Sequence, residues 1–323
     1  MKNFWQNKKV LITGFEGFLG SNLTLNLLSK GASIVGLDIQ TDRKDTIFTP
    51  EEYKKIKVIK GDVADFTLVK KIISGSKIEI VFHLAAEAIV GKSHQNPLKT
   101  FSSNIEGTWN ILEACRNAKT IESIVVASSD KAYGSHKKLP YREDAPLIGN
   151  HPYDVSKSCA DLIAYTYFHT YGLPVAVTRC GNIYGPGDFN FSRIVPDAMR
   201  SALSGKTLLI RSDGKFTRDY VYVDDIVNGY IILAERLNKL GLGGESFNFS
   251  DENPITVIEL VNKIFKLLGK KPDYKILNKA NYEIKHQYLA SRKARTLLGW
   301  KPDNTLAGGL KKTLKWYSHG FGR

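Results

Sequence analysis

Short apolar segments alternate with longer amphipathic segments through the first half of the chain, and this alternation restricts its fold more than any other feature. Strands are expected at residues 8–14, 33–39, 56–63, 78–86, 122–129 and 173–185. Helices are expected at residues 20–31, 67–74, 97–118 and 153–172. A β-α-β succession of this kind predicts a parallel sheet with helices on both faces.

The pattern changes after about residue 185, where loops rich in Gly, Pro and Asp separate shorter elements. Further helices are expected at 224–237, 256–269 and 293–302. We therefore predict an α/β fold with a Rossmann-type doubly wound parallel sheet. Residues 1–180 would form the dinucleotide-binding domain, with a segment near 220–250 returning to it. Residues 181–323 would mainly form a smaller C-terminal substrate-binding domain.

Composition narrows the class of protein. The 323 residues carry a formal net charge of +14, but the lysines are dispersed and no nucleic-acid motif is present, so we expect a lysine-rich surface and no nucleic-acid partner. No stretch has the length of a membrane span, and no cleavable leader or membrane partner is expected. The three cysteines lack metal or disulfide spacing, which predicts a cytoplasmic protein with no metal site.

Three glycines, Gly14, Gly17 and Gly20, follow the first expected strand and open a helix in the sequence GFEGFLG. Glycines at such a turn let the backbone approach a pyrophosphate, which the helix N-terminus then receives. Asp38 ends the second strand, where a carboxylate binds the ribose 2′-hydroxyl and repels a 2′-phosphate. The spacing therefore favours NAD over NADP, although Arg43 nearby would soften that preference.

Two assignments around this site stay open from the residues alone. Asp62, after the third strand, either binds the adenine edge or caps a helix. His83, within the expected buried strand 78–86, is more often a hydrogen-bonded core histidine than a catalyst.

Tyr153 and Lys157 lie four residues apart at the start of a helix, in YDVSK, so they share one face. The lysine ammonium and a cationic cofactor ring would lower the pKa of the tyrosine, which makes Tyr153 a candidate base for a substrate hydroxyl. This spacing alone is also common in solvent-facing helix pairs. Behind a dinucleotide turn the catalytic interpretation is favoured.

Four polar side chains, Ser128, Ser129, Asp130 and Lys131, end the expected buried strand 122–129 in the sequence ASSDKAYG. An acid and a base placed side by side at the edge of a sheet suggest chemistry, because burying them is costly. A surface ion pair is the alternative.

The chain resembles the extended short-chain dehydrogenase/reductase superfamily, in particular its NAD-dependent nucleotide-sugar epimerases and dehydratases. The resemblance covers essentially the whole length. It rests on the following segments: GFEGFLG, Asp38, HLAA, SNIEGTWNILEAC, ASSDKAYG, YDVSK, TRCGNIYGPG, RDYVYVDD and LGWKP. It implies a tightly held NAD that is reduced and reoxidised in each turnover. It also implies further cofactor contacts at Phe18, Leu19, Val63, Leu84, Ala85, Ala86 and Asn104.

Within this superfamily, Ser128 to Lys131 is similar to the T-S-D-K of CDP-glucose 4,6-dehydratases, whereas epimerases tend to carry a small or hydroxyl residue after the serine pair. The segment TRDYVYVDDIV is more similar to epimerases and dTDP-sugar enzymes. We expect a 4,6-dehydratase, with CDP-glucose favoured. A 4-epimerase and a non-catalytic NAD-binding regulatory protein are the alternatives.

The expected catalytic roles follow from the chemistry of a 4-keto sugar. Asp130 would protonate O6 as the acid, and Ser129 would bind O4 and share its proton with Tyr153. Lys131 would act either as a cation that holds Asp130 or the enolate, or as a base.

Substrate contacts are expected at Glu87, Ser129, Asn182, Arg193, Arg218 and Arg292. Asn182 has the alternative of a turn asparagine, and Arg292 that of a helix-capping surface cation. The helices expected at 97–118 and 153–171 resemble the pair that forms dimers in this family, so we also expect a homodimer.

Overall fold

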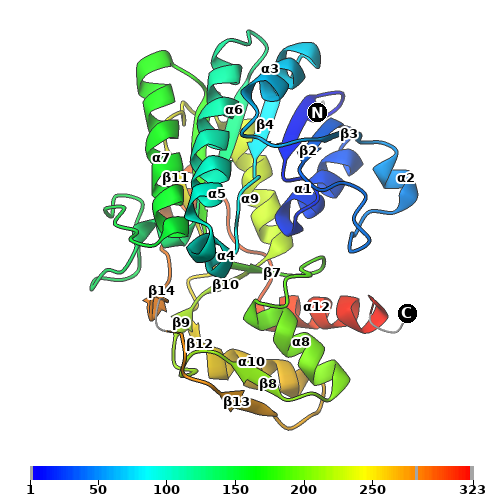
Figure 1. Ribbon diagram of the computed structural model, residues 1–323, viewed down its shortest axis with the longest axis vertical. Helices are drawn as coiled ribbons and strands as arrows, with labels where there is room; N and C mark the ends of the chain where they lie inside the picture. The colour runs from blue at the N-terminus through cyan, green and yellow to red at the C-terminus, as the bar shows by residue number, and fades with distance from the viewer. Residues whose placement is uncertain (1–2, 281–282, 321–323) are drawn as a thin grey trace.

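The computed structural model describes residues 3–280 and 283–320. A large α/β part lies above a smaller part in Figure 1. Within the described residues the large part contains a seven-stranded sheet. Its strands are β1 (Lys9–Thr13), β2 (Ser33–Asp38), β3 (Lys57–Lys60), β4 (Ile80–His83), β5 (Ser123–Ala127), β6 (Val175–Cys180) and β11 (Ser246–Phe249).

The strand order is β11-β6-β5-β4-β1-β2-β3, and all neighbouring strands run parallel. The predicted doubly wound parallel sheet is therefore confirmed. The chain starts in the middle and winds outward in both directions, so the order reverses between β1 and β4. In such sheets ligands bind at the carboxyl ends of the strands beside this reversal.

Helices cover both faces of the sheet (Figure 1). One face packs against α1 (Phe18–Ser29), α9 (Val223–Arg236) and α11 (Arg292–Leu298). The other packs against α3 (Phe66–Gly75), α6 (Gly107–Arg116) and α7 (Pro152–Tyr171). Each central strand feeds both cores because successive side chains point to opposite faces. In β1, Val10 and Ile12 join the first core and Leu11 joins the second.

The helix expected at 97–118 is helical throughout most of that range but not uniform. It runs as α5 (Pro97–Phe101), a π-helical turn at Ser102–Glu106 and then α6. Two short helices that the sequence did not predict, α2 (Pro50–Tyr53) and α4 (Val90–Gln95), follow β2 and β4 along the chain. Helix α7 ends at Gly172, which has a φ of +67°, as its glycine predicts.

The smaller part has its own apolar core. Its elements are β7 (Asn182–Tyr184), α8 (Ile194–Ser204), β8 (Leu208–Ile210), β9 (Thr217–Arg218), β10 (Tyr220–Tyr222), β12 (Ile255–Thr256), α10 (Val257–Leu267), β13 (Tyr274–Ile276), β14 (His286–Gln287) and α12 (Leu306–Gly320). Strand β7 pairs with β10, β8 with β13, and β9 lies between β12 and β14. The sequence did not predict α8 or α12. In the described residues, no helix combines the length and apolar character needed to cross a bilayer.

Candidate active site

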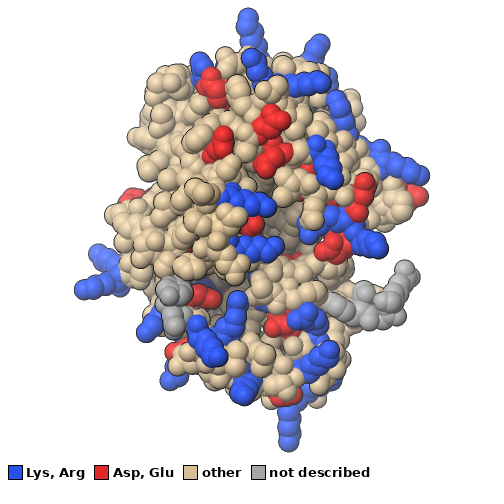
Figure 2. All heavy atoms as spheres, viewed as in Figure 1, with Lys and Arg blue, Asp and Glu red and all other residues tan. Residues whose placement is uncertain are grey.

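A cleft of about 1250 Å³ lies at the carboxyl ends of the central strands, between the sheet and the smaller part. Its walls include residues from the glycine turn, the ends of β2, β4 and β5, the start of α7, and the segments around α8 and β9. Lys and Arg are scattered over the face in Figure 2 and do not gather in one patch, as the dispersed lysines predict.

The glycine turn makes a close-packed cradle. Gly14 has a φ of +71°, and a Cβ there would come within 2.9 Å of the Ala85 backbone. A Cβ on Gly20 would come within 2.1 Å of the Gly14 carbonyl oxygen. Helix α1 starts without a side-chain cap and without an acidic residue in its first turn, so its first N–H groups are available to an anion. The turn therefore fits a pyrophosphate.

Asp38 lies at the end of β2 and lines the cleft. Its Oδ2 accepts a hydrogen bond from the Glu16 backbone N–H at 3.1 Å, and its Oδ1 accepts one from Gln40 at 3.2 Å. The carboxyl group is thus oriented for a ribose hydroxyl. Asp62 also lines the cleft, and its Oδ1 accepts the Ala64 N–H at 3.0 Å. The cap of α3 is Asp65 instead, which removes the helix-cap alternative for Asp62.

Tyr153 and Lys157 project from the first turns of α7 into the same cleft. The Lys157 ammonium donates to the Ala127 carbonyl oxygen at 2.7 Å, which fixes it at the end of β5. Burial lowers the pKa of Lys157 to about 8, so the amine is mostly charged at pH 7.

Tyr153 differs from the expectation. Burial raises its pKa to about 12, and a hydrogen bond with Ser129 and the charge of Arg193 offset this only in part. The predicted lowering involved Lys157 together with the cationic ring of a bound cofactor. The protein groups by themselves leave the pKa of Tyr153 raised and the side chain a phenol.

Asp130 and Lys131 open a single turn of 3₁₀ helix, Asp130–Tyr133, that follows β5. Ser129 caps this turn, since its hydroxyl accepts the Lys131 N–H at 3.2 Å and donates to Asp130 Oδ1 at 3.1 Å. Burial raises the pKa of Asp130, while Lys131 and Arg218 act in the opposite direction. The pair is therefore not a surface ion pair, because Asp130 is only 6% exposed and both residues line the cleft.

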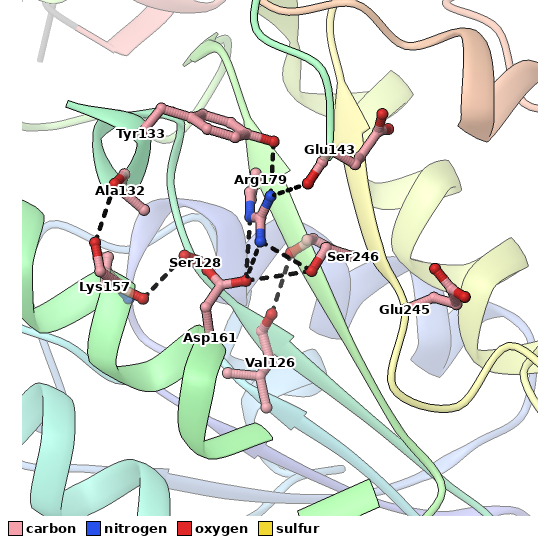
Figure 3. Close-up of polar contacts among 12 residues, drawn as sticks. Val126, Ser128, Ala132, Tyr133, Glu143, Lys157, Asp161, Arg179, Glu245 and Ser246 are labelled. Carbon is pink, nitrogen blue, oxygen red and sulfur yellow. Dashed lines mark hydrogen bonds and ion pairs between the residues drawn. The ribbon is translucent and has the colours of Figure 1, made fainter. Parts of the chain in front are cut away.

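A buried polar network holds this turn from behind (Figure 3). The Arg179 guanidinium, on β6, donates to Asp161 Oδ1 of α7 at 2.7 Å and to the Tyr133 hydroxyl at 2.8 Å. Tyr133 is the last residue of the turn, and its hydroxyl donates to Asn248 of β11 at 2.7 Å. The guanidinium also lies over the Tyr133 ring, 4.8 Å from its centroid. Arg179 thus joins β6, α7, β11 and the acid-bearing turn.

On the substrate side, Glu87, Asn182, Arg193 and Arg218 all line the cleft. Arg193 forms an ion pair with Asp188 at 3.3 Å. The Arg218 guanidinium donates to the carbonyl oxygens of Thr217, Ile284 and Lys285 and lies 3.7 Å from the Glu283 carboxylate. A phosphate that binds Arg218 must compete with these contacts.

Two predicted site residues lie outside the cleft lining. Asn104 is buried, accepts the Glu87 N–H at 2.7 Å and donates to Ser156 at 2.8 Å, so it positions the loop after β4. Arg292 is exposed at the start of α11. The other predicted cofactor contacts, Phe18, Leu19, Val63, Leu84, Ala85 and Ala86, line the cleft. His83 is buried and bonded to Thr13 and Thr108, as expected of a core histidine.

Arg179 and its partners were not expected from the sequence. The available signal was an arginine inside a strand that is otherwise apolar, because a buried guanidinium requires a partner. Asp154, which is buried at the start of α7, was not expected either. Burial raises the pKa of Asp154, and the charge of Lys131 lowers it by a smaller amount. In the described residues no group of three or more His, Cys, Asp or Glu side chains is arranged to hold a metal ion.

Comparison with known proteins agrees with this geometry. The model of the GDP-mannose 4,6 dehydratase family matches residues 11–313. A CDP-glucose 4,6-dehydratase from Salmonella typhimurium is 33% identical over 332 residues, which cover 98% of this chain and 92% of that protein. A UDP-glucuronate 4-epimerase from Thermodesulfobacterium geofontis is 33% identical over 321 residues, covering 95% of each.

This chain belongs to the nucleotide-sugar dehydratase and epimerase family. The solved structures to which the chain is similar also include both dehydratases and epimerases. The dTDP-glucose 4,6-dehydratase DesIV from Streptomyces venezuelae, with NAD bound, superimposes with a TM-score of 0.87 at 28% identity, covering 97% of this chain and 98% of that one. The UDP-glucose 4-epimerase from Thermotoga maritima, with UDP-glucose, has a TM-score of 0.85 at 27% identity, covering 97% and 99%.

The Arg179 network predicts the effect of Tyr133→Phe. The variant loses the hydroxyl that links Arg179 to Asn248 and should lower the free energy of unfolding by about 1–2 kcal/mol. Hydrogen exchange should become faster in residues 128–149 and stay unchanged in 160–171. Tyr167→Phe, which removes a more exposed hydroxyl bonded to Glu113, is the control. Unchanged exchange in 128–149 would show that the network does not hold the turn.

Proposed function

We propose that the protein binds NAD and acts as a nucleotide-sugar 4,6-dehydratase, with CDP-glucose as the favoured substrate. The observation that carries this proposal is Asp130. Its carboxyl group is buried at the end of β5, its pKa is raised by that burial, and it lies in the same cleft as Tyr153. A 4,6-dehydratase requires an acid of this kind to protonate O6 of the sugar as water leaves.

NAD, when bound at the glycine turn, supplies the acceptor for the C4 hydride and later its donor for C6. The protein groups handle the protons. Tyr153, as a phenolate, would take the O4 proton through Ser129 when C4 is oxidised. The Lys157 ammonium, fixed on the Ala127 carbonyl oxygen, and the cationic ring of the cofactor would stabilise this phenolate. Once C4 is a ketone, the C5 proton is acidic. Glu87, a carboxyl group that also lines the cleft, would take this proton while Asp130 protonates O6, so that water is lost across C5–C6.

We assign Lys131 as the cation of the site. It lies close enough to Asp130 and Asp154 to lower the pKa of each against the effect of burial. A positive charge near two buried carboxyl groups offsets their mutual repulsion and would stabilise the enolate. Asp154 is thereby part of the same polar group as the acid.

CDP-glucose is favoured over other nucleotide sugars on two grounds. The sequence Ser128 to Lys131 is similar to the corresponding stretch of CDP-glucose 4,6-dehydratases. The relative from Salmonella typhimurium, named for that activity, is also similar over nearly the whole chain. A 4-epimerase is the second candidate, because Tyr153, Lys157 and the glycine turn would serve it equally and epimerases are among the relatives.

A nucleotide-sugar screen tests the proposal. The purified protein should convert CDP-glucose to a product that has lost one water, as measured by mass spectrometry, with slower or no conversion of the dTDP-, UDP- and GDP-sugars. Products of unchanged mass would identify an epimerase. Dehydration of another nucleotide sugar only would retain the reaction and correct the substrate.

Asp130→Asn separates the steps of the reaction. The amide keeps the shape of the side chain but cannot donate the acidic proton, so water loss should fall by about 100-fold or more, while reduction of NAD by the C4 hydride continues. Absorbance of the reduced cofactor and product mass report the two steps. Asp144→Asn, in an exposed ion pair with Arg142, is the matched control. Near-normal water loss in Asp130→Asn would refute its role as the acid.

The homodimer remains a proposal and rests on an exposed apolar face. Leu98, Trp109, Leu162 and Tyr165 are between 44% and 80% exposed. They project from α5, α6 and α7, which lie side by side in Figure 1. A second copy of the chain would cover this face with the same helices. The continuous helical segment from α5 to α6, together with α7, would then form a four-helix interface with its counterparts in the other copy.

Leu162→Glu tests the dimer. A buried charge at the centre of a symmetric interface occurs twice, so the variant should be a monomer where the unaltered protein is a dimer. Light scattering after size-exclusion chromatography gives the mass. Leu297→Glu, at an exposed leucine of α11 on the opposite face of the sheet, should remain dimeric. A monomeric unaltered protein at micromolar concentration would exclude the proposed interface.

A further inference from the structure

Glu16 lies inside the glycine turn and is buried, with only 5% of its surface exposed. Its Oε1 accepts a hydrogen bond from the Tyr53 hydroxyl at 2.7 Å. Its Oε2 is buried, and among the described residues it has no hydrogen-bond partner. A carboxylate oxygen in that state is costly. Its presence in the turn that must receive a dinucleotide therefore calls for a reason.

The second carboxyl group beside it belongs to Asp38. The Glu16 N–H donates to Asp38 Oδ2, so the two residues adjoin. Burial raises the pKa of both side chains, and the nearby Asp38 charge raises that of Glu16 further. The positive charge of Arg43 lowers the pKa of both carboxyl groups. We call Glu16, Asp38 and Arg43 together the acidic corner. Asp38 and Arg43 line the cleft.

NAD and NADP differ in the part of the molecule that would lie beside Glu16, Asp38 and Arg43. NAD has a ribose 2′-hydroxyl that can donate to Asp38, whereas NADP has a phosphate there with a charge of about −2. Arg43 would attract that phosphate. Its Nε lies 3.6 Å from Asp45 Oδ1, so part of its charge is compensated within its own loop. With the Asp38 carboxylate alone opposing the Arg43 charge, the preference for NAD over NADP would be weak.

We propose that Glu16 is a second determinant of cofactor choice, whose negative charge acts with Asp38 to offset Arg43 and exclude a 2′-phosphate. Glu16 acts through space, since its side chain is buried behind Asp38 and does not line the cleft. The inference rests on the proposed use of NAD but not on the dehydratase reaction.

Glu16 also has a structural contact that must be separated from this role. The Tyr53 hydroxyl that it binds accepts the Asp42 N–H at 3.0 Å, so the contact ties the loop at residues 39–49 to the glycine turn. Glu16→Gln keeps an acceptor for Tyr53 and removes the charge. Tyr53→Phe keeps the charge and removes the tie.

The experiment measures the affinity of the purified full-length protein for NAD and for NADP by calorimetry, after removal of bound nucleotide. The unaltered protein should prefer NAD. Glu16→Gln should strengthen NADP binding about tenfold relative to NAD. Tyr53→Phe should weaken both and leave their ratio unchanged. Arg43→Ala, in an exposed loop, should move the ratio in the opposite direction, further toward NAD.

The outcomes are distinct. An unchanged ratio in Glu16→Gln, with NAD still bound, overturns the role of Glu16 and leaves the use of NAD standing. If Tyr53→Phe shifts the ratio of the two affinities as much as Glu16→Gln does, the effect comes from the loop, and the role of Glu16 is again overturned. An unaltered protein that binds neither nucleotide overturns the use of NAD and this inference together.

Discussion

One guanidinium, that of Arg179, holds together the parts of the chain on which the site depends. It bonds to Asp161 of α7, to Tyr133 at the end of the acid-bearing turn and to Ser246 at the start of β11. A buried ion pair of this kind adds little stability by itself, but removal of one partner costs about 3–5 kcal/mol. A single turn of 3₁₀ helix has few internal hydrogen bonds and needs an external anchor. The network supplies it, and it also links that turn to the helix that carries Tyr153 and Lys157.

Burial sets the proton chemistry of the cleft. It lowers the pKa of Lys157 to about 8 and raises those of Asp130 and Tyr153. Each shift disfavours the charged form, as expected where water is excluded. Both shifts favour the proton-bearing form, a carboxyl for Asp130 and a phenol for Tyr153. Loss of water requires such an acid, whereas oxidation of a hydroxyl requires a group that accepts its proton, so the charge of a bound cofactor ring would have to act on Tyr153.

The large α/β part was predicted well from the sequence, because its strands and helices have clear local patterns of apolar residues. The alternation of strands and helices up to residue 180 contained six of the seven strands of the sheet, all but β11, because strands buried on both faces are continuously apolar and their helices are amphipathic. The smaller part was less predictable. Its strands have only two or three residues, and α12 contains a Gly-Gly pair that obscures its helical pattern. Such elements are stabilised by tertiary packing more than by their own propensity.

The same distinction applies to the site. Glycines, Asp38 and the Tyr153–Lys157 pair carry local signals and line the cleft as expected. Asn104, which was expected from the resemblance, and Arg292 are not part of the cleft lining. The pKa of Tyr153 was expected to fall beside Lys157 and a cationic cofactor ring. The protein groups by themselves raise it, because spacing reveals a neighbouring charge but not the extent of burial. Desolvation depends on residues distant in sequence and outweighs a single charge here.

Net charge is a poor guide to what this cleft accepts. The chain carries a formal charge of +14, yet its lysines are spread over the surface, where solvent and salt screen them. The corner formed by Glu16 and Asp38 is acidic. Glu16 is buried, Asp38 is partly buried, and Arg43 beside them is paired with Asp45. Charges in a desolvated corner act over short distances with little screening, so two carboxyl groups there outweigh many exposed lysines. An acidic corner at Glu16 and Asp38 is thus compatible with a strongly basic chain.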